Sequence, residues 1–353
     1  MPLRPHHTIP AMKPADAPRL GPALVAWHSR SGRHDLPWQR DRSPYRVWIS
    51  EIMLQQTQVA TVLTYYARFL ESFPDVQALA AASQDAVLGL WSGLGYYSRA
   101  RNLHRCAQQV VTVHGGAFPR SAEQLQTLPG IGRSTAAAIA AFCFDERIAI
   151  LDGNVKRVLA RVRGFADDLA VARHERTLWD LAQGMVPAAP ADMPAYTQGL
   201  MDLGATVCLP RAPLCGVCPV QSLCTAQSAG EPTRYPVRTR KLKRSAQSLW
   251  LLLARRADGA VWLDKRPQQG VWAGLYCLPV FESDAALRAA VPAQASPVDG
   301  VPFVHVLTHK DLHLHPVGVD LSTQSPAGSG AWFGADQWPA LGLPAPVRKL
   351  LAD

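Results

Sequence analysis

Four cysteines near the middle of the chain have a spacing that suits an inorganic cofactor. They form the pattern Cys208-x6-Cys215-x2-Cys218-x5-Cys224. Four thiolates in one short loop match the ligand number of a [4Fe–4S] cluster. Structural zinc commonly uses two tight Cys pairs, and only one C-x2-C occurs here, so the spacing fits zinc less well. Because the cysteines are crowded and no export signal is evident, metal binding is favoured over disulfides.

Two carboxylates could form an acid–base pair. Hydrolysis of a glycosidic bond needs one group that protonates the leaving group and another that stabilises a cationic sugar. Glu51, in VWISEIMLQQTQV, is expected to open a helix behind a Ser50 cap, and Asp152 precedes NVKRVLARV. Each has a structural alternative, since Glu51 could complement the helix dipole and Asp152 could serve as an N-cap. Taken singly, these alternatives are favoured.

A glycine-containing turn between two helical segments could hold an anion. The string LPGIGRSTAAAIA places Gly130 and Gly132 after AEQLQT and before an alanine-rich helix. Glycines let backbone N–H groups approach an anion at the positive end of a helix. A lone G-x-G is also typical of an ordinary tight turn. With a helix on each side, the string resembles a helix-hairpin-helix, which contacts the DNA backbone without selecting sequence.

An ordered set of segments identifies a family. The cysteine spacing resembles the cluster loop of the endonuclease III superfamily of DNA glycosylases. The segments HDLPWQRDRSPYRVWISEIMLQQTQV, LWSGLGYYSRARNL, LPGIGRSTAAAIA and LDGNVKRVLAR precede that loop in this order. Together they are similar, over nearly the whole chain, to the adenine DNA glycosylases commonly called MutY. The resemblance implies a [4Fe–4S] cluster and base excision repair of adenine mispaired with 8-oxoguanine or guanine.

The resemblance also assigns roles to residues. It implies that Glu51 protonates adenine and assists water attack, while Asp152 stabilises the sugar cation. Residues expected at the water and the adenine pocket are Asn154, Trp38, Gln198 and Ser134. Residues expected to contact DNA are Gln56 and Tyr96, beside the opposite base, and Gly130 and Gly132. Considered without the resemblance, Gln56 would be a surface helical amide and Tyr96 a packed loop aromatic.

Ser134 separates this chain from the lyases of the superfamily. In those relatives a lysine at this point forms a Schiff base with the sugar, and a serine hydroxyl cannot form that imine. Base release without efficient strand cleavage is therefore expected.

The C-terminal part resembles a Nudix-like module, beginning with LDKRPQQGVWAGLYCLPVF. A catalytic Nudix hydrolase needs a cluster of glutamates for Mg²⁺, and after GVWAGLYCLP only Glu282 precedes DAALRAAV. We expect recognition here without pyrophosphatase activity. The family's 8-oxoguanine-reading loop is commonly Phe-Ser-His, and the counterpart here is Leu307-Thr308-His309. Thr308 and His309 keep a hydroxyl and an imidazole for hydrogen bonds to the lesion.

The hydrophobic pattern indicates which elements position these residues. Helix-period segments run from Gly21 to about Cys224, including SEIMLQQTQVATVLTYYARFL as one helix, and SLWLLLARR and AVWLDKRP then read as a strand–turn–strand. The expected fold is a mainly α helix-hairpin-helix domain followed by an α+β domain with a helix near DAALRAAV. The predicted division is a tail at 1–20, a glycosylase domain at 21–226, a basic linker at 227–247 and a Nudix-like domain at 248–353.

Bulk properties agree with this division. At 353 residues two domains are the default, and a formal charge of +9 favours a polyanionic partner. No stretch approaches the roughly 20 apolar residues of a membrane span. We expect a monomer that binds double-stranded DNA in the bacterial cytoplasm. The alternatives are an endonuclease III-like pyrimidine glycosylase with lyase activity, a non-catalytic DNA damage-binding protein and, least favoured, a Nudix nucleotide hydrolase.

Overall fold

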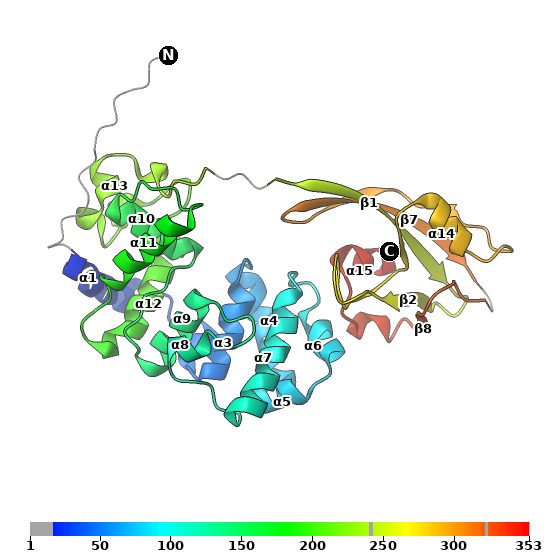
Figure 1. Cartoon of the computed structure of the whole chain (residues 1–353), viewed down its shortest axis with the longest axis horizontal. Helices are drawn as coiled ribbons and strands as arrows, with labels where there is room; N and C mark the ends of the chain where they lie inside the picture. The colour runs from blue at the N-terminus through cyan, green and yellow to red at the C-terminus, as the bar shows by residue number, and fades with distance from the viewer. Residues whose placement is uncertain (1–16, 240–242, 322–323, 353) are drawn as a thin grey trace, which may run out of the picture. The chain divides into compact units, whose positions relative to one another are not determined.

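The structure is a computed structural model that describes residues 17–239, 243–321 and 324–352. Its contacts group the chain into two compact units (Figure 1). The first unit joins residues up to 55 with residues 109–241, and the second joins residues 56–108 with residues 242–353. Most of the expected N-terminal tail, residues 1–16, lies outside the described residues, and the first helix begins at Ala17.

The first unit is helical, as the sequence predicts. Its helices are α1 (Ala17–Ser31), α2 (Pro37–Arg40), α3 (Pro44–Leu54), α8 (Ala122–Leu125), α9 (Arg133–Phe144), α10 (Gly153–Arg163), α11 (Ala172–Gln183), α12 (Met193–Asp202) and α13 (Thr225–Ser228). Helix α7 (Ser98–His114) begins in the second unit and ends in the first. The alanine-rich α9 contacts α3, α8 and α12 and is buried from Thr135 to Phe142, so small side chains let three neighbours approach it closely.

The expectation of one helix running from Ser50 to Leu70 is wrong. Helix α3 starts earlier, because Ser43 caps it through a hydrogen bond to the Arg46 N–H and Pro44 occupies its first position. Ser50 lies inside this helix and donates to the Val47 carbonyl at 2.8 Å. The helix ends at Leu54, and a new helix, α4, begins at Val59. Gln56, between them, has a left-handed φ of +56° and therefore breaks the helical path.

Helix α10 begins behind the N-cap that the sequence predicts. The Asp152 side chain caps it, and Gly164 ends it with φ +61°. A π-helical segment, Leu203–Val207, continues α12 toward the cysteine loop. Such segments disturb the regular hydrogen-bond ladder and are frequent at functional sites.

The second unit contains α4 (Val59–Ser72), α5 (Val76–Ala81), α6 (Gln84–Trp91) and the start of α7, together with the C-terminal sheet. Asp85 of α6 ties the helices to the sheet through an ion pair with Lys265 at 2.6 Å and a hydrogen bond from the Tyr276 hydroxyl. The Tyr97 hydroxyl donates to the Leu343 carbonyl at 2.7 Å.

The C-terminal sheet is mixed. Its strands are β1 (Ser245–Arg255), β2 (Val261–Lys265), β3 (Tyr276–Cys277), β4 (Val280–Phe281), β5 (Val298–Asp299), β6 (Phe303–Val306), β7 (Lys310–Asp320) and β8 (Ala331–Phe333). The long strands β1 and β7 run parallel, with Leu249 opposite Leu314, while β2 pairs antiparallel with β1. The predicted strand–turn–strand after the linker is therefore confirmed.

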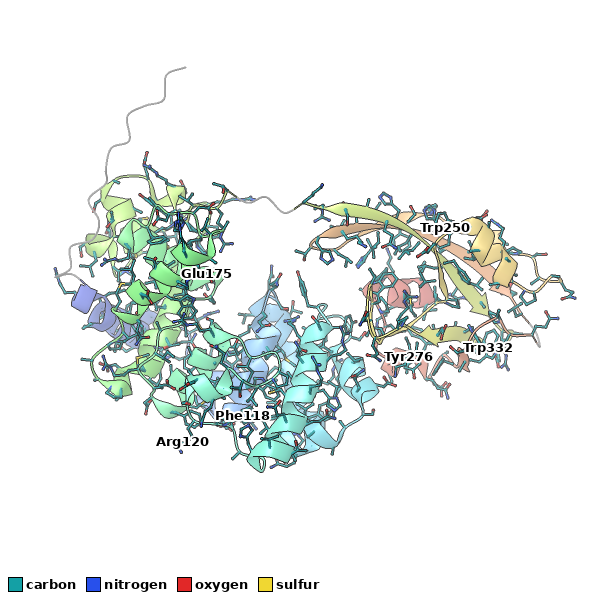
Figure 2. The ribbon with its side chains drawn as sticks, viewed as in Figure 1. Phe118, Arg120, Glu175, Trp250, Tyr276 and Trp332 are labelled. Carbon is teal, nitrogen blue, oxygen red and sulfur yellow. The ribbon has the colours of Figure 1, made fainter. Side chains whose placement is uncertain are left out.

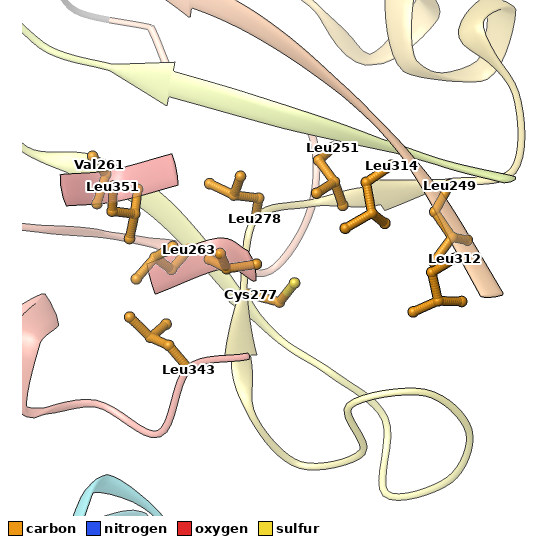
Figure 3. Packing of buried hydrophobic residues seen from close by; sticks show 11 residues of the cluster. Leu249, Leu251, Val261, Leu263, Cys277, Leu278, Leu312, Leu314, Leu343 and Leu351 are labelled. Carbon is orange, nitrogen blue, oxygen red and sulfur yellow. The ribbon is translucent and has the colours of Figure 1, made fainter. Parts of the chain in front are cut away.

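Alternation along β1 and β7 supplies a core on each face of the sheet. On one face Leu249, Leu251, Leu312 and Leu314 belong to a core that also includes Val261 of β2 and Leu351 of α15 (Ala345–Ala352) (Figure 3). On the other face lies Leu287 of α14 (Asp284–Ala290), the helix expected near DAALRAAV. Trp250 of β1 and Trp332 of β8 pack against this second core (Figure 2).

Among the described residues, no helix is both long and apolar enough to cross a membrane.

Candidate active site

Glu51 lies in the last turns of α3, between the buried residues Ser50 and Ile52. Because α3 starts at Pro44, Glu51 is too far from its N-terminus to complement the helix dipole there, and this structural alternative for Glu51 is excluded. Its side chain keeps some solvent contact, as a group lining a pocket must, yet protein atoms surround it closely. Burial, and to a lesser extent the nearby charge of Asp152, raises the pKa of Glu51 to about 8.

Asp152 is held at the N-terminus of α10. Its Oδ1 accepts a hydrogen bond from the Val155 N–H at 2.7 Å, so Asp152 is the N-cap of α10. Burial raises the pKa of this carboxyl, while the Val155 and Asn154 N–H groups and the cations Arg157 and Lys156 act in the opposite direction. Unlike Glu51, Asp152 thus has four nearby groups that favour its anion.

The two carboxylates form an unequal pair. Each is closely surrounded by protein atoms, and the negative charge of Asp152 disfavours a second charge on Glu51. Because the donors and cations surround only Asp152, the proton shared by such a pair belongs on Glu51. At neutral pH the arrangement offers a neutral acid beside an anion, and this combination suits acid-assisted departure of a base from a sugar cation.

Asn154 is fixed by a buried arginine. The Arg157 guanidinium donates to Asn154 Oδ1 at 2.9 Å, to the Gly204 carbonyl at 2.7 Å and to the Cys208 carbonyl at 2.8 Å. A Cβ on Gly204 would lie only 2.7 Å from the Asn154 Cβ. The π-helical segment therefore packs directly on the residue expected to hold the catalytic water, and glycine is required at that contact.

The hairpin lies before α9 and leads to Ser134. Gly130 has φ +76°, and Gly132 is an exposed N-cap whose absent Cβ faces open space among the described residues. The Ser134 Oγ accepts from the Leu151 N–H at 3.2 Å. Ser134 is thus fixed beside the residue that precedes Asp152, and the exposed backbone of the turn is accessible to a phosphate.

The two residues expected at the adenine edge and wall are buried on neighbouring helices of the same unit. Trp38 is on α2, which packs against α3, and Gln198 is on α12, which packs against α9. The Gln198 amide nitrogen donates to Asp202 Oδ1 at 2.9 Å.

In the second unit, Gln56 and Tyr96 are exposed residues in the left-handed region, with φ +56° and +48°. Bulky residues rarely adopt this conformation, so such residues often mark functional sites. The Arg99 guanidinium lies 5.5 Å from the centre of the Tyr96 ring and donates to the Gly95 carbonyl at 3.2 Å, which supports the loop.

Thr308 and His309 are exposed in the turn between β6 and β7. The Thr308 Oγ1 lies 2.6 Å from the Tyr96 hydroxyl oxygen, so the structure brings together two residues that the sequence assigned separately to DNA. Arg244 supports the turn by donating to the Thr308 carbonyl and pairing with Asp311. Within the described residues, the His309 side chain makes no hydrogen bond to Tyr96 or to Arg244.

The four clustered cysteines line one cavity, together with apolar side chains that include Val158, Leu203 and Val207. All four thiols therefore reach a common space, and thiolates in an apolar enclosure suit an iron–sulfur cluster. The buried Arg161 donates to the Cys208 Sγ at 3.3 Å and to the Leu209, Pro210 and Tyr235 carbonyls. These residues fit a cluster, which Cys208, Cys215, Cys218 and Cys224 would hold.

Sequence reasoning missed Arg157, Arg161 and Asp202, all of which are buried. A signal was present, because Arg157 and Arg161 are four residues apart on one face of a helix that also contributes apolar residues to the core. Asp202 likewise follows Gln198 by one helical turn. Charged residues on an otherwise buried face are expected to be paired.

The chain is similar over most of its length to proteins of one family. The chain is 34% identical over 338 residues to "Adenine DNA glycosylase" of Buchnera aphidicola subsp. Acyrthosiphon pisum (strain APS), covering 94% of this chain and 96% of that protein. This chain belongs to the adenine DNA glycosylase family. The protein of that name from Rattus norvegicus is 49% identical over 235 residues, covering 64% of this chain and 44% of its own length.

Models of protein families match three parts of this glycosylase. Residues 49–183 match the HhH-GPD superfamily of base excision DNA repair proteins, residues 208–224 the iron-sulfur binding domain of endonuclease III, and residues 250–353 the NUDIX domain. A thermostable thymine-DNA glycosylase of known structure covers 61% of this chain with a TM-score of 0.53 and 26% identity. The expected fold class, the DNA glycosylase activity and the [4Fe–4S] cofactor are thereby confirmed, and DNA is the partner.

Proposed function

We propose that this glycosylase hydrolyses the N-glycosidic bond of adenine mispaired with 8-oxoguanine, or with guanine, in double-stranded DNA. One observation carries the proposal: Glu51, with a pKa raised to about 8, lies beside Asp152 in a chain whose relatives are named adenine DNA glycosylases. The site therefore offers a proton and an anion together at neutral pH.

The proposed reaction uses one proton on Glu51. Adenine is rotated out of the duplex, and the Glu51 carboxyl protonates a ring nitrogen while the bond between C1′ and N9 breaks. The sugar becomes cationic, and the Asp152 carboxylate stabilises that charge. Glu51, now ionised, takes a proton from a water molecule held by Asn154 as the water oxygen bonds to C1′. The products are free adenine and an abasic site, with the proton back on Glu51.

The remaining site residues are proposed to hold DNA and base. Trp38, Gln198 and Ser134 border the adenine, while the Gly130 and Gly132 turn binds a phosphate of the same strand. Gln56 and Tyr96 occupy the gap in the duplex beside the opposite base. The iron–sulfur cluster, when bound, supplies a structural tie for its loop, because hydrolysis of a base transfers no electron.

The second unit is proposed to read the opposite base. Thr308 and His309 offer a hydroxyl and an imidazole, and Thr308 is adjacent to Tyr96. We propose that the Nudix-like part recognises the lesion without hydrolysing nucleotides. The functional divisions are then 1–20, 21–226, 227–247 and 248–353. The protein acts as a monomer in the cytoplasm, where bacterial DNA lies.

Ser134 supports a monofunctional reaction. Its hydroxyl is fixed by the Leu151 N–H and cannot form an imine with the sugar aldehyde. We therefore expect abasic sites rather than broken strands.

The decisive test measures released adenine and strand breaks on 8-oxoguanine:A, G:A and T:A duplexes, before and after alkali. Adenine release that is fastest opposite 8-oxoguanine, needs alkali for strand scission and is abolished in Glu51→Gln supports the proposal. Absence of adenine release contradicts it and favours a non-catalytic damage-binding protein. Excision of oxidised pyrimidines with strand breaks before alkali favours an endonuclease III-like lyase.

A further inference from the structure

Asp202 gathers an unusual number of hydrogen bonds for a residue that the proposed chemistry does not use. It is 1% exposed and ends α12, one helical turn after Gln198. Its Oδ1 accepts from Arg33 Nε at 2.7 Å and Gln198 Nε2 at 2.9 Å, and Arg33 Nη2 lies 2.6 Å from the same atom. Its Oδ2 accepts from the Arg33 backbone N–H at 2.9 Å.

This environment surrounds Asp202 with hydrogen-bond donors. A guanidinium contacts the carboxylate through two nitrogens, and the backbone of the same residue adds a third donor. Buried carboxylates persist when such charge-assisted hydrogen bonds surround them. His28 Nε2 is 3.9 Å from Oδ2, too far for a hydrogen bond, so Arg33 supplies the countercharge.

Both carboxyl oxygens of Asp202 accept hydrogen bonds from Arg33, so Asp202 acts as an acceptor, and this fixes the direction of the Gln198 amide. The two ends of a glutamine amide look alike in shape, and their assignment depends on the partner. Here the NH2 end must face Asp202. The carbonyl oxygen, Oε1, therefore points away from Asp202, and among the residues that the structure describes it accepts no hydrogen bond.

We propose that Asp202 is a positioning residue. By holding the NH2 end of the Gln198 amide, it presents only the Oε1 acceptor to the base and thereby selects a purine with an amino group at C6. Adenine carries a donor there, whereas hypoxanthine and guanine carry an acceptor oxygen. A glutamine free to rotate would satisfy either. This inference rests on the proposed function, in which Gln198 borders the flipped base.

The test is an internal competition between two 8-oxoguanine duplexes, one with adenine and one with hypoxanthine as the target base. The ratio of the two excision rates does not depend on how much enzyme is active, so it can be measured even when part of a variant is unfolded. Comparing each variant with the wild type also cancels the intrinsic difference in bond strength between the two nucleosides.

In Asp202→Asn the amide can present either end to Gln198, so Gln198 can rotate toward hypoxanthine. The adenine preference should fall roughly ten-fold, the loss expected when a buried donor–acceptor match no longer discriminates. Gln198→Leu should lower the preference similarly, and adding Asp202→Asn to it should change nothing more, because Asp202 acts through Gln198. Asp180→Asn, an exposed acid on α11, serves as the matched control.

An unchanged ratio in Asp202→Asn overturns the inference, whatever Gln198→Leu does, and leaves Asp202 as an anchor for Arg33. A further loss on adding Asp202→Asn to Gln198→Leu also overturns it, because the effect would then bypass Gln198. Failure of the wild type to release any adenine is a different result, since it contradicts the proposed function itself.

Discussion

At the residue scale, burial of Glu51 sets the pH range of the reaction. Its pKa is raised to about 8, so the acid form predominates at neutral pH and is lost as pH rises through about 8. If Glu51 delivers the proton, the single-turnover rate of adenine release should be level near neutral pH and then fall, approaching ten-fold per pH unit above about 9. A pH profile on an 8-oxoguanine:A duplex measures this. A rate that keeps rising between pH 7 and pH 10 would exclude Glu51 as the acid.

The same burial should cost stability. In the unfolded chain Glu51 has its ordinary pKa of 4.5, so at pH 7 it must take up a proton on folding. The folded state binds more protons between about pH 4.5 and 8, and stability therefore declines as pH rises through that window. At pH 7 this corresponds to about 3 kcal/mol. Glu51→Gln should remove the decline, making the variant more stable than wild type at pH 8 but not at pH 4. Denaturant unfolding at both pH values tests this, and equal differences would contradict it.

Some of these residues could be placed from the sequence and others could not. Asp152 as a helix cap and the crowded cysteines were predictable because capping and ligation depend on local spacing. The break after α3 was not, because apolar residues such as Ile52 and Val59 keep helical spacing on either side of the polar residues Gln55–Gln58. The start signal of α3 is Ser43-Pro44. Arg157 and Asp202 could not be placed either, since their partners Gly204 and Arg33 lie far along the chain.

At the scale of elements, the π-helical segment Leu203–Val207 positions the start of α10. Gly204 leaves no room for a side chain, because its Cβ would meet the Asn154 Cβ at 2.7 Å. Gly204→Ala should shift Asn154 and lower the rate of adenine release on the order of ten- to a hundred-fold, with little change in DNA affinity. Single-turnover rates and binding measured together provide the test. Gly184→Ala, at the end of α11, is the matched control, since a Cβ there makes only ordinary contacts of 3.6 and 3.7 Å.

A second element-scale prediction concerns α10 and the cysteine loop. Arg161 joins them through Cys208 Sγ and three backbone carbonyls. Arg161→Leu leaves these buried acceptors without their donor, so the free energy of unfolding should fall by about 3 kcal/mol or more. Iron content per chain and visible absorbance should decrease with it. Arg163→Leu, on another face of the same helix, should retain the iron, and equal iron loss in both variants would argue against a specific role for Arg161.

At the scale of the whole molecule, the candidate residues divide between the two units. Glu51, Asp152 and the cysteines belong to the first, and Gln56, Tyr96 and Thr308 belong to the second. The chemistry and the reading of the opposite base are therefore separable by mutation, even though one chain holds both. The formal charge of +9 acts on any duplex, so it should make binding salt-sensitive without distinguishing one base pair from another.

Thr308→Val tests this division, because it keeps the shape of the side chain and removes the hydroxyl that lies 2.6 Å from the Tyr96 oxygen. The preference for 8-oxoguanine:A over G:A should fall several-fold, corresponding to about 1 kcal/mol for one hydrogen bond. The rate on G:A itself should change little, because the acid and the anion are in the other unit. Tyr96→Phe combined with Thr308→Val should lose less than the sum of the two single effects, since both remove the same contact. If Thr308→Val instead slows both substrates equally, the turn between β6 and β7 supports catalysis in general and does not read the lesion.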